Sequence, residues 1–105
     1  MARFDVYFTP IADDRKHTPF WLDVQANHLQ TLCTRVVIPL RKLSAKEAIK
    51  QRLNPEFLVE ETRVYADTAN LGTFPLARLG RPVFSLRDKR LAIGETLDFY
   101  SAAIE

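Results

Sequence analysis

Few residues of this chain are of the types that bind metals or act as nucleophiles, and they are scattered. The histidines are His17 and His28, and the single cysteine is Cys33. No set of ligands with the spacing of a zinc site surrounds either histidine, so we expect surface histidines and no metal. No catalytic motif surrounds Cys33, and we interpret it as a thiol of a loop or of the core.

Two pairs of adjacent carboxylates, Asp13-Asp14 and Glu60-Glu61, are candidates for acid–base chemistry. Neighbouring side chains of an extended segment point in opposite directions. Adjacent carboxylates therefore do not face one another as the acid pairs of glycosidases do. We interpret both pairs as solvated turns, and the sequence predicts no catalytic residue and no cofactor.

Basic side chains are more numerous and offer a possible face for binding phosphate. The candidates are Arg35, Arg41, Lys42, Arg78, Arg81, Arg87, Lys89 and Arg90. Nearby acidic residues balance them, which is typical of an ordinary solvated surface. The residues alone leave both interpretations open.

Length and charge limit the classes of protein to consider. The 105 residues are enough for one small domain, spanning 1–105. The formal net charge is +2, from 15 basic and 13 acidic residues. This charge is too small to predict binding to nucleic acid or membranes, and it is compatible with an acidic protein partner. One cysteine allows no internal disulfide, and we find neither a signal peptide nor a membrane span, so we expect a cytoplasmic location.

Two apolar segments organise the middle of the chain. In residues 20–25 the apolar Phe20, Leu22 and Val24 alternate with Trp21, Asp23 and Gln25, and residues 35–40 contain three β-branched side chains in a row. Both patterns predict strands, the second nearly buried on both faces. Because Pro39 cannot donate a ladder hydrogen bond, we expect it at a sheet edge, a bulge or a strand exit.

Further strands are predicted at residues 3–8, 57–59 and 63–66, with a short edge strand at 75–79. Residues 67–74 are expected to form a polar connection. Ser44 and Glu47 form a capping box, which predicts a short helix ending before Asn54.

The C-terminal part of the chain has helical periodicity. Ser85 and Asp88 form a second capping box, and apolar residues recur at helical spacing. These residues are Leu86, Ile93, Leu97, Tyr100 and Ile104. Gly94 has two interpretations: it lets a second backbone approach closely, or it is tolerated inside the helix without a role. Five or more antiparallel strands followed by one helix predict a mainly β fold, a small barrel or rolled sheet with a terminal helix.

The chain resembles the CcdB family, the toxins of plasmid and chromosomal toxin–antitoxin pairs. The segments that match are Asp23-Val24-Gln25 and Thr34-Arg35-Val36-Val37-Ile38-Pro39-Leu40, followed by Thr68, Leu71, Gly80, Val83 and Leu86 in the spacing of the family. Residues 9–19 and 41–54 fit the family pattern poorly.

The resemblance implies an SH3-like barrel with a C-terminal helix, of the kind shared by CcdB, Kid and MazF, and a two-fold homodimer. It implies the toxin of a type II toxin–antitoxin pair that is not an enzyme. Such toxins bind the gyrase A subunits of DNA gyrase, trapping cleaved DNA, and an antitoxin with a disordered arm removes them. Ile93, Gly94, Leu97 and Tyr100 are then expected on the core or dimer face of the terminal helix.

The resemblance ends at the C-terminus. Family toxins finish with Trp-Gly-Ile, whose tryptophan stacks on an arginine of gyrase, and this chain has Ala102, Ala103 and Ile104 there, followed by Glu105. Upstream, His28 and Leu29 replace two isoleucines, and Asp98 replaces an asparagine. Since a tryptophan at a binding hot spot typically contributes about 2 kcal/mol or more, the sequence predicts weak or lost gyrase poisoning.

The alternative is an RNA-cleaving toxin of the MazF or Kid type, with the basic face holding phosphates. Those enzymes carry a loop with glycine and glutamate before a central strand. The matching region of this chain, residues 26–36, has neither residue type. Arg35 is the basic residue whose substitution tests this alternative.

Overall fold

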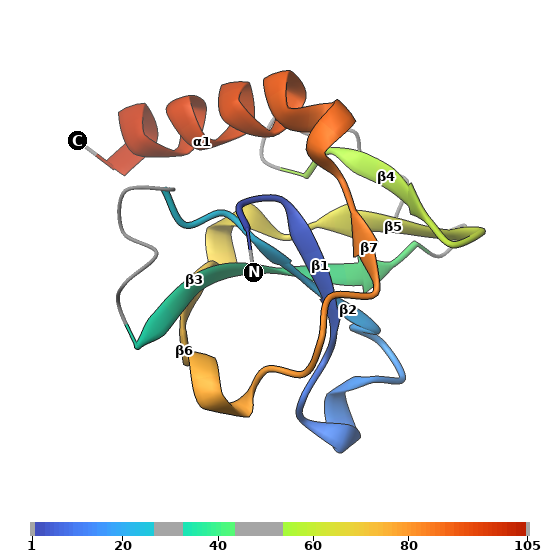
Figure 1. The fold of residues 1–105 in the computed structure, drawn as a ribbon. Helices are drawn as coiled ribbons and strands as arrows, with labels where there is room; N and C mark the ends of the chain where they lie inside the picture. Colours follow the sequence, from blue (N-terminus) through green and yellow to red (C-terminus); the bar gives the residue numbers. More distant parts are fainter. Residues whose placement is uncertain (1, 27–32, 44–53, 105) are drawn as a thin grey trace.

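Seven antiparallel strands followed by one α-helix make up the described part of the chain in the computed structural model (Figure 1). The structure describes residues 2–26, 33–43 and 54–104. The strands are β1 (Asp5–Phe8), β2 (Phe20–Asp23), β3 (Thr34–Lys42), β4 (Glu56–Val59), β5 (Thr62–Ala66), β6 (Gly72–Pro75) and β7 (Phe84–Ser85), and the helix is α1 (Arg90–Ile104). This confirms the predicted mainly β fold with one C-terminal helix.

The strands form one sheet in the order β4-β5-β3-β2-β1-β7, with β6 paired to β3 off this path. The sheet curls into a nearly closed barrel, and α1 lies across one end of it (Figure 1). Strand β3 organises the sheet because its nine residues reach three partners. It pairs with β2 on one side, and on the other with β6 at its start and β5 at its end.

The prediction for Pro39 was wrong, since this residue lies inside β3 and pairs with Trp21 of β2. It is placed after the residues that pair with β6, which end at Val37, and before those that pair with β5, which begin at Leu40. No ladder hydrogen bond from its nitrogen is required at this junction. Its carbonyl still accepts a hydrogen bond from the Asp67 amide, at 3.0 Å.

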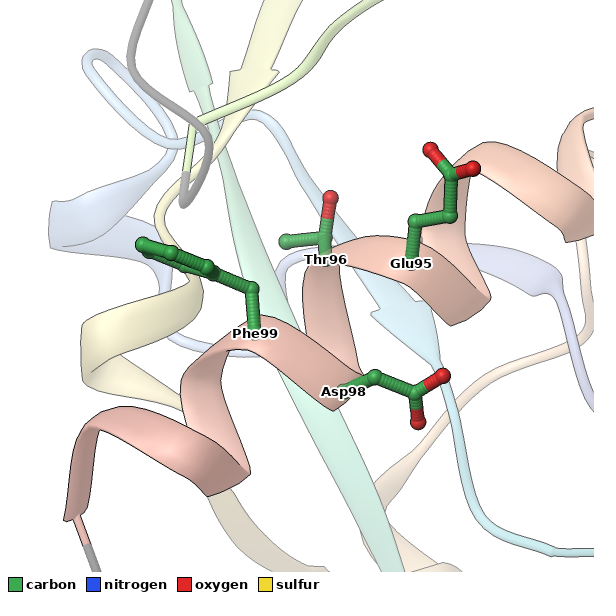
Figure 2. A pocket seen from close by; sticks show the side chains of 4 residues that line it. All are labelled: Glu95, Thr96, Asp98 and Phe99. Carbon is green, nitrogen blue, oxygen red and sulfur yellow. The ribbon is translucent and has the colours of Figure 1, made fainter.

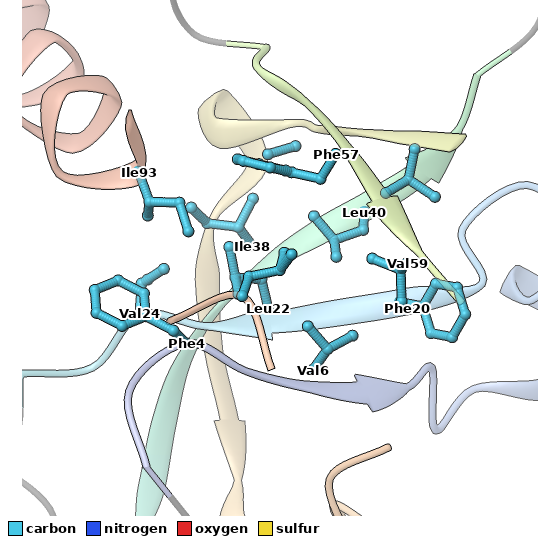
Figure 3. Close-up of a cluster of buried hydrophobic side chains, with 13 residues drawn as sticks. Phe4, Val6, Phe20, Leu22, Val24, Ile38, Leu40, Phe57, Val59 and Ile93 are labelled. Atoms are coloured by element: carbon cyan, nitrogen blue, oxygen red, sulfur yellow. The ribbon is translucent and has the colours of Figure 1, made fainter. Parts of the chain in front are cut away.

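Alternation along the strands creates the core (Figure 3). Leu22 of β2 and Ile38 and Leu40 of β3 are buried on the inner side of the barrel. Val59 and Val64 join them from the β4–β5 hairpin, and Ile93 of α1 points into the same cluster (Figure 3). The helix is thereby attached to the barrel by its apolar side.

The chain between β5 and β7 differs from the prediction. Residues 67–74 are not a simple connection, since they contain a 3-10 turn, Thr68–Asn70, and the start of β6. The predicted strand at 75–79 is wrong, because Leu76–Arg78 form another 3-10 turn. Gly72 and Pro75, the first and last residues of β6, are of types that strands disfavour, and pairing with β3 places them in the sheet.

The helix begins later than its capping box predicts. Ser85 belongs to β7 and pairs with Asp5, so its backbone is in the sheet. Its hydroxyl accepts a hydrogen bond from the Arg87 amide at 3.3 Å, and a 3-10 turn, Arg87–Lys89, leads into α1 at Arg90. The helix predicted from Ser44 lies outside the described residues.

Candidate functional site

The C-terminal half of α1 carries the described part of the predicted contact surface. Asp98 and Ala102 are both exposed, and they share one side of the helix because they are four residues apart. Ala103 and Ile104 are the last helical residues. His28, Leu29 and Glu105 lie outside the described residues.

A hollow of about 460 Å³ lies beside this surface and is lined, among the described residues, by Glu95, Thr96, Asp98 and Phe99 (Figure 2). Thr96 and Phe99 point to the same side of the helix, and Asp98 turns away from them (Figure 2). The Thr96 hydroxyl donates to the Ala92 carbonyl at 3.1 Å. Sequence reasoning missed Glu95, Thr96 and Phe99, and the only signal in the sequence was an aromatic residue, Phe99, at helical spacing from the acidic Glu95.

The opposite side of α1 faces the barrel. Ile93 is buried in the core, and Leu97 packs against it. Tyr100 is half-buried. Gly94 differs from these three, since a Cβ atom added to it meets nothing within 4 Å. Ile93 and Leu97 therefore serve the core, and a role of Gly94 in a dimer stays a prediction.

A buried ion pair occupies the outer side of the sheet, where β2 and β3 are adjacent. Arg35 Nη2 lies 2.5 Å from Asp23 Oδ2, and the two side chains are 1% and 0% exposed. Arg35 Nε also donates to Oδ2, at 2.8 Å. Sequence reasoning placed Arg35 among surface residues for binding phosphate, and that assignment is wrong because the guanidinium is buried against a carboxylate.

Gln25 extends this polar cluster. Its backbone amide donates to Asp23 Oδ1 at 3.0 Å, and its side-chain Oε1 accepts from the Val36 backbone amide at 3.0 Å. Burial raises the pKa of Asp23, and the hydrogen bonds from Gln25 and Arg35 oppose that rise. The cluster ties the end of β2 to β3 and has a structural role.

Tyr7 of β1 is also fully buried. Burial, followed by the negative charges of Asp23 and Asp5, raises its pKa to about 12, against a smaller opposing effect of Arg35. Its hydroxyl has no hydrogen-bond partner among the described residues. Burial of this kind disfavours the ionised form of the phenol.

The other basic candidates divide into paired and exposed residues. Arg41 pairs with Asp67, 2.6 Å from Nε to Oδ2, and donates to the Thr18 hydroxyl at 2.8 Å. The Arg78 guanidinium lies over the Phe74 ring, 5.0 Å from its centroid. Arg78 is itself exposed, as are the remaining candidates Lys42, Arg81, Arg87, Lys89 and Arg90.

The residues considered for metal or nucleophilic chemistry are separate from these clusters. His17 and Cys33 are exposed. Within residues 2–26, 33–43 and 54–104, no group of three or more His, Cys, Asp or Glu side chains is arranged to hold a metal ion. In the same ranges, no helix combines the length and apolar character needed to span a membrane.

Comparison with known families identifies the fold and its class of function. The profile described as CcdB protein matches residues 3–102, nearly the whole chain. No curated protein matches the sequence closely enough for comparison. The matched range includes the buried cluster of Asp23, Gln25 and Arg35, together with the whole barrel and most of α1. The chain therefore belongs to the CcdB family, whose members are toxins of toxin–antitoxin pairs and poison DNA gyrase.

Proposed function

We propose that this protein is the toxin component of a type II toxin–antitoxin pair that acts by binding proteins, without catalysis, and that its poisoning of gyrase is weak or lost. The observation that carries the proposal is the exposed Ala102 at the end of α1, inside a family match that stops at this residue. The surface around it has the accessibility that a contact with a partner needs.

The change from Trp-Gly-Ile to Ala102, Ala103 and Ile104 falls on the interface and not on the fold. Alanine is the best helix former, and α1 stays helical as far as Ile104. An exposed methyl group buries far less area than an indole, and each Å² of lost apolar contact removes about 25 cal/mol. An arginine of the partner also loses its cation–π contact.

The test is a gyrase cleavage-trapping assay on the natural chain and on a variant with Ala102→Trp, Ala103→Gly and Glu105 deleted. We expect trapped DNA only with the variant. If both proteins are inactive, the next variant also replaces His28, Leu29 and Asp98 with the residues of the family. Trapping by the natural chain at the level of an active family toxin contradicts the proposal.

The matched control is Leu91→Trp, which adds an indole to the same helix at a position that is 79% exposed. This substitution adds an indole to the surface as the first variant does, but position 91 lies about three helical turns away from Ala102. We expect no gain of trapping from this control. A gain equal to that of the tail variant would mean that any exposed tryptophan suffices.

The proposed partner in the cell is an acidic or partly disordered antitoxin encoded beside this gene. The net charge of +2 suits such a partner, and disordered arms that fold on binding wrap large surfaces. A short neighbouring reading frame with a charged, flexible C-terminal tail supports this partner, and co-expression with that frame should yield a complex. A solitary gene would leave it without support.

The RNA-cleaving alternative has lost its main candidate residue. Arg35 is buried and ion-paired, so it cannot hold a phosphate at the surface without unfolding its surroundings. We expect no cleavage of long single-stranded RNA by the purified protein. Cleavage that is abolished by substitution of the exposed Arg81 or Arg87 would restore the alternative.

A further inference from the structure

A second hollow, of about 230 Å³, lies on the outer side of the sheet, and none of its described lining residues belongs to α1. Its floor is formed by Val37 and Pro39 of β3 and by Gly72 of β6, which pairs with Val37. A Cβ atom built on Gly72 meets nothing within 4 Å, and the φ angle of this glycine is not positive. The backbone does not require glycine at this position, and the missing side chain leaves the floor open.

One wall of the hollow is aromatic. Trp21 lines it and is the only tryptophan in the chain. Phe74 contacts the indole edge to face, with ring centroids 4.6 Å apart, and Arg78 lies over Phe74 in turn. These contacts hold the indole in position as a rigid apolar surface.

The rim is polar and contains both donors and acceptors. It consists of Arg41, Asn70, Asp14, Thr18 and Thr73. Asp67 holds two of these side chains, since Oδ2 accepts from Arg41 Nε at 2.6 Å and from Asn70 Nδ2 at 2.7 Å. The Arg41 guanidinium has five N–H donors, and its hydrogen bonds to Asp67 and Thr18 use two of them.

The charges of the site disfavour a simple anion as its ligand. The carboxylate of Asp67 compensates Arg41, and Asp14 adds a further negative charge at the rim. An isolated phosphate would therefore find little net attraction. A purely apolar group would leave the donors of Arg41 and the carboxylate of Asp14 without partners, which is costly in a partly enclosed site.

We propose that this hollow binds a nucleobase, a flat ring that stacks on apolar surfaces and carries hydrogen-bond donors and acceptors on its edge. The base stacks on Trp21 in the aromatic wall, and its edge contacts Arg41, Asn70 and Asp14 in the polar rim. The base comes from a free nucleotide or from single-stranded nucleic acid. The inference is independent of the proposed toxin function and goes beyond it.

Trp21 makes the test direct, because the intrinsic tryptophan fluorescence of the protein reports on this site only. The full chain is titrated with GMP, AMP, CMP and UMP, and separately with single-stranded oligoribonucleotides of each base. We expect saturable quenching of the fluorescence with at least one base. Equal affinity per base in both forms indicates a free nucleotide, and much tighter binding of the oligomer indicates a strand. No quenching with any of these probes at millimolar concentration overturns the proposal.

Gly72→Val fills the hollow, and its control is Gly80→Val, at an exposed glycine that also has open space around it. We expect Gly72→Val to weaken binding by roughly tenfold or more, comparable with the loss of one stacked base, while thermal unfolding stays unchanged. Gly80→Val should bind as the natural chain does. If Gly72→Val does not fold, the double variant Asp14→Ala with Asn70→Ala is tested in its place. Both residues are exposed at the rim, and this variant should also bind the nucleotide more weakly. Undiminished quenching in whichever variant is folded overturns the proposal.

Discussion

At the scale of single residues, polar groups inside the protein determine how two strands are joined. Asp23, Gln25 and Arg35 form a hydrogen-bonded cluster that is almost fully buried. These residues also belong to the segments by which the sequence resembles the CcdB family. Their types are therefore explained by folding, and a search for function at Arg35 alone starts from the wrong place.

Breaking this ion pair should strongly destabilise the protein. Asp23→Asn keeps the shape of the side chain but removes the negative charge that faces the buried Arg35 guanidinium, at a cost of about 3–5 kcal/mol. The free energy of unfolding in urea measures the effect, with Asp13→Asn as the exposed control, which should change it by less than about 0.5 kcal/mol. A similar small change for Asp23→Asn would show that the pair contributes little.

Tyr7 should make stability depend on alkaline pH. Its pKa is about 12 in the folded protein and 10.0 when exposed, so above about pH 10 the unfolded chain loses a proton that the folded protein retains. Stability is then fully present below about pH 10 and falls by up to about 2–3 kcal/mol as the pH rises to 12.

Tyr7→Phe should remove this part of the pH dependence. Because it also deletes a buried hydroxyl that has no partner among the described residues, stability at neutral pH should not decrease by much. Urea unfolding across the alkaline range measures both effects, and Tyr100→Phe is the half-buried control. An unchanged slope for Tyr7→Phe would assign the alkaline loss to other groups.

At the scale of elements, the β4–β5 hairpin has a turn whose residues oppose its geometry. Glu60 and Glu61 have φ angles of 47° and 72°, which is the pattern of a type I′ turn, usually built from Asn-Gly. For side chains with a Cβ atom this conformation costs about 1 kcal/mol or more each. The hairpin forms because Phe57, Val59 and Val64 bury its inner face in the core.

Replacing this turn should stabilise the protein. Glu60→Asn with Glu61→Gly should raise the free energy of unfolding by about 1–2 kcal/mol, since the left-handed conformation then carries little strain. The control is Glu60→Gln with Glu61→Gln, which removes the same charges and keeps the strain. Equal stability of the two variants would mean that charge, and not backbone conformation, limits the hairpin.

At the scale of the whole molecule, one side of α1 closes the barrel and another is free for partners. Ile93 and Leu97 face the core, whereas Leu91, Asp98 and Ala102 are exposed. A Cβ atom added to Gly94 meets nothing within 4 Å, so no side chain of the described residues blocks this position. The structure of one chain is therefore compatible with the two-fold dimer that the resemblance to the family implies.

Light scattering coupled to size exclusion should give a mass of about twice 12.1 kDa. Gly94→Leu should shift this mass towards the monomer without lowering thermal stability, because the added side chain meets no atom within the chain itself at the Cβ position. Gly80→Leu, at an exposed loop glycine, is the matched control and should leave the dimer intact. A monomer at all concentrations contradicts the dimer, and a dimer unaffected by Gly94→Leu places its interface elsewhere.

The sequence by itself determined the fold class, because alternation in β1 and β2, the run of β-branched residues in β3 and helical spacing in α1 are local patterns. It also determined the family, whose residues follow one another in a recognisable order. It also indicated that the C-terminus diverges from the family, since Ala102 stands in the sequence where family toxins have tryptophan. The sequence predicted the position of the turn at Glu60 and Glu61 correctly, but it did not predict the left-handed backbone conformation of these two residues.

Only the tertiary structure decided the features that depend on neighbours distant in the chain. Pairing with β3 made a strand of Gly72–Pro75 and gave Pro39 a place inside a sheet. Burial against Asp23 removed Arg35 from the surface, and pairing of Ser85 with Asp5 delayed the start of the helix. In each case a long-range contact outweighed the local preference, because strand pairing and desolvation involve more free energy than the propensity of a single residue. The hollow beside Trp21 has the same origin, since three separate segments of the chain, residues 14–21, 37–41 and 70–73, must meet to form it.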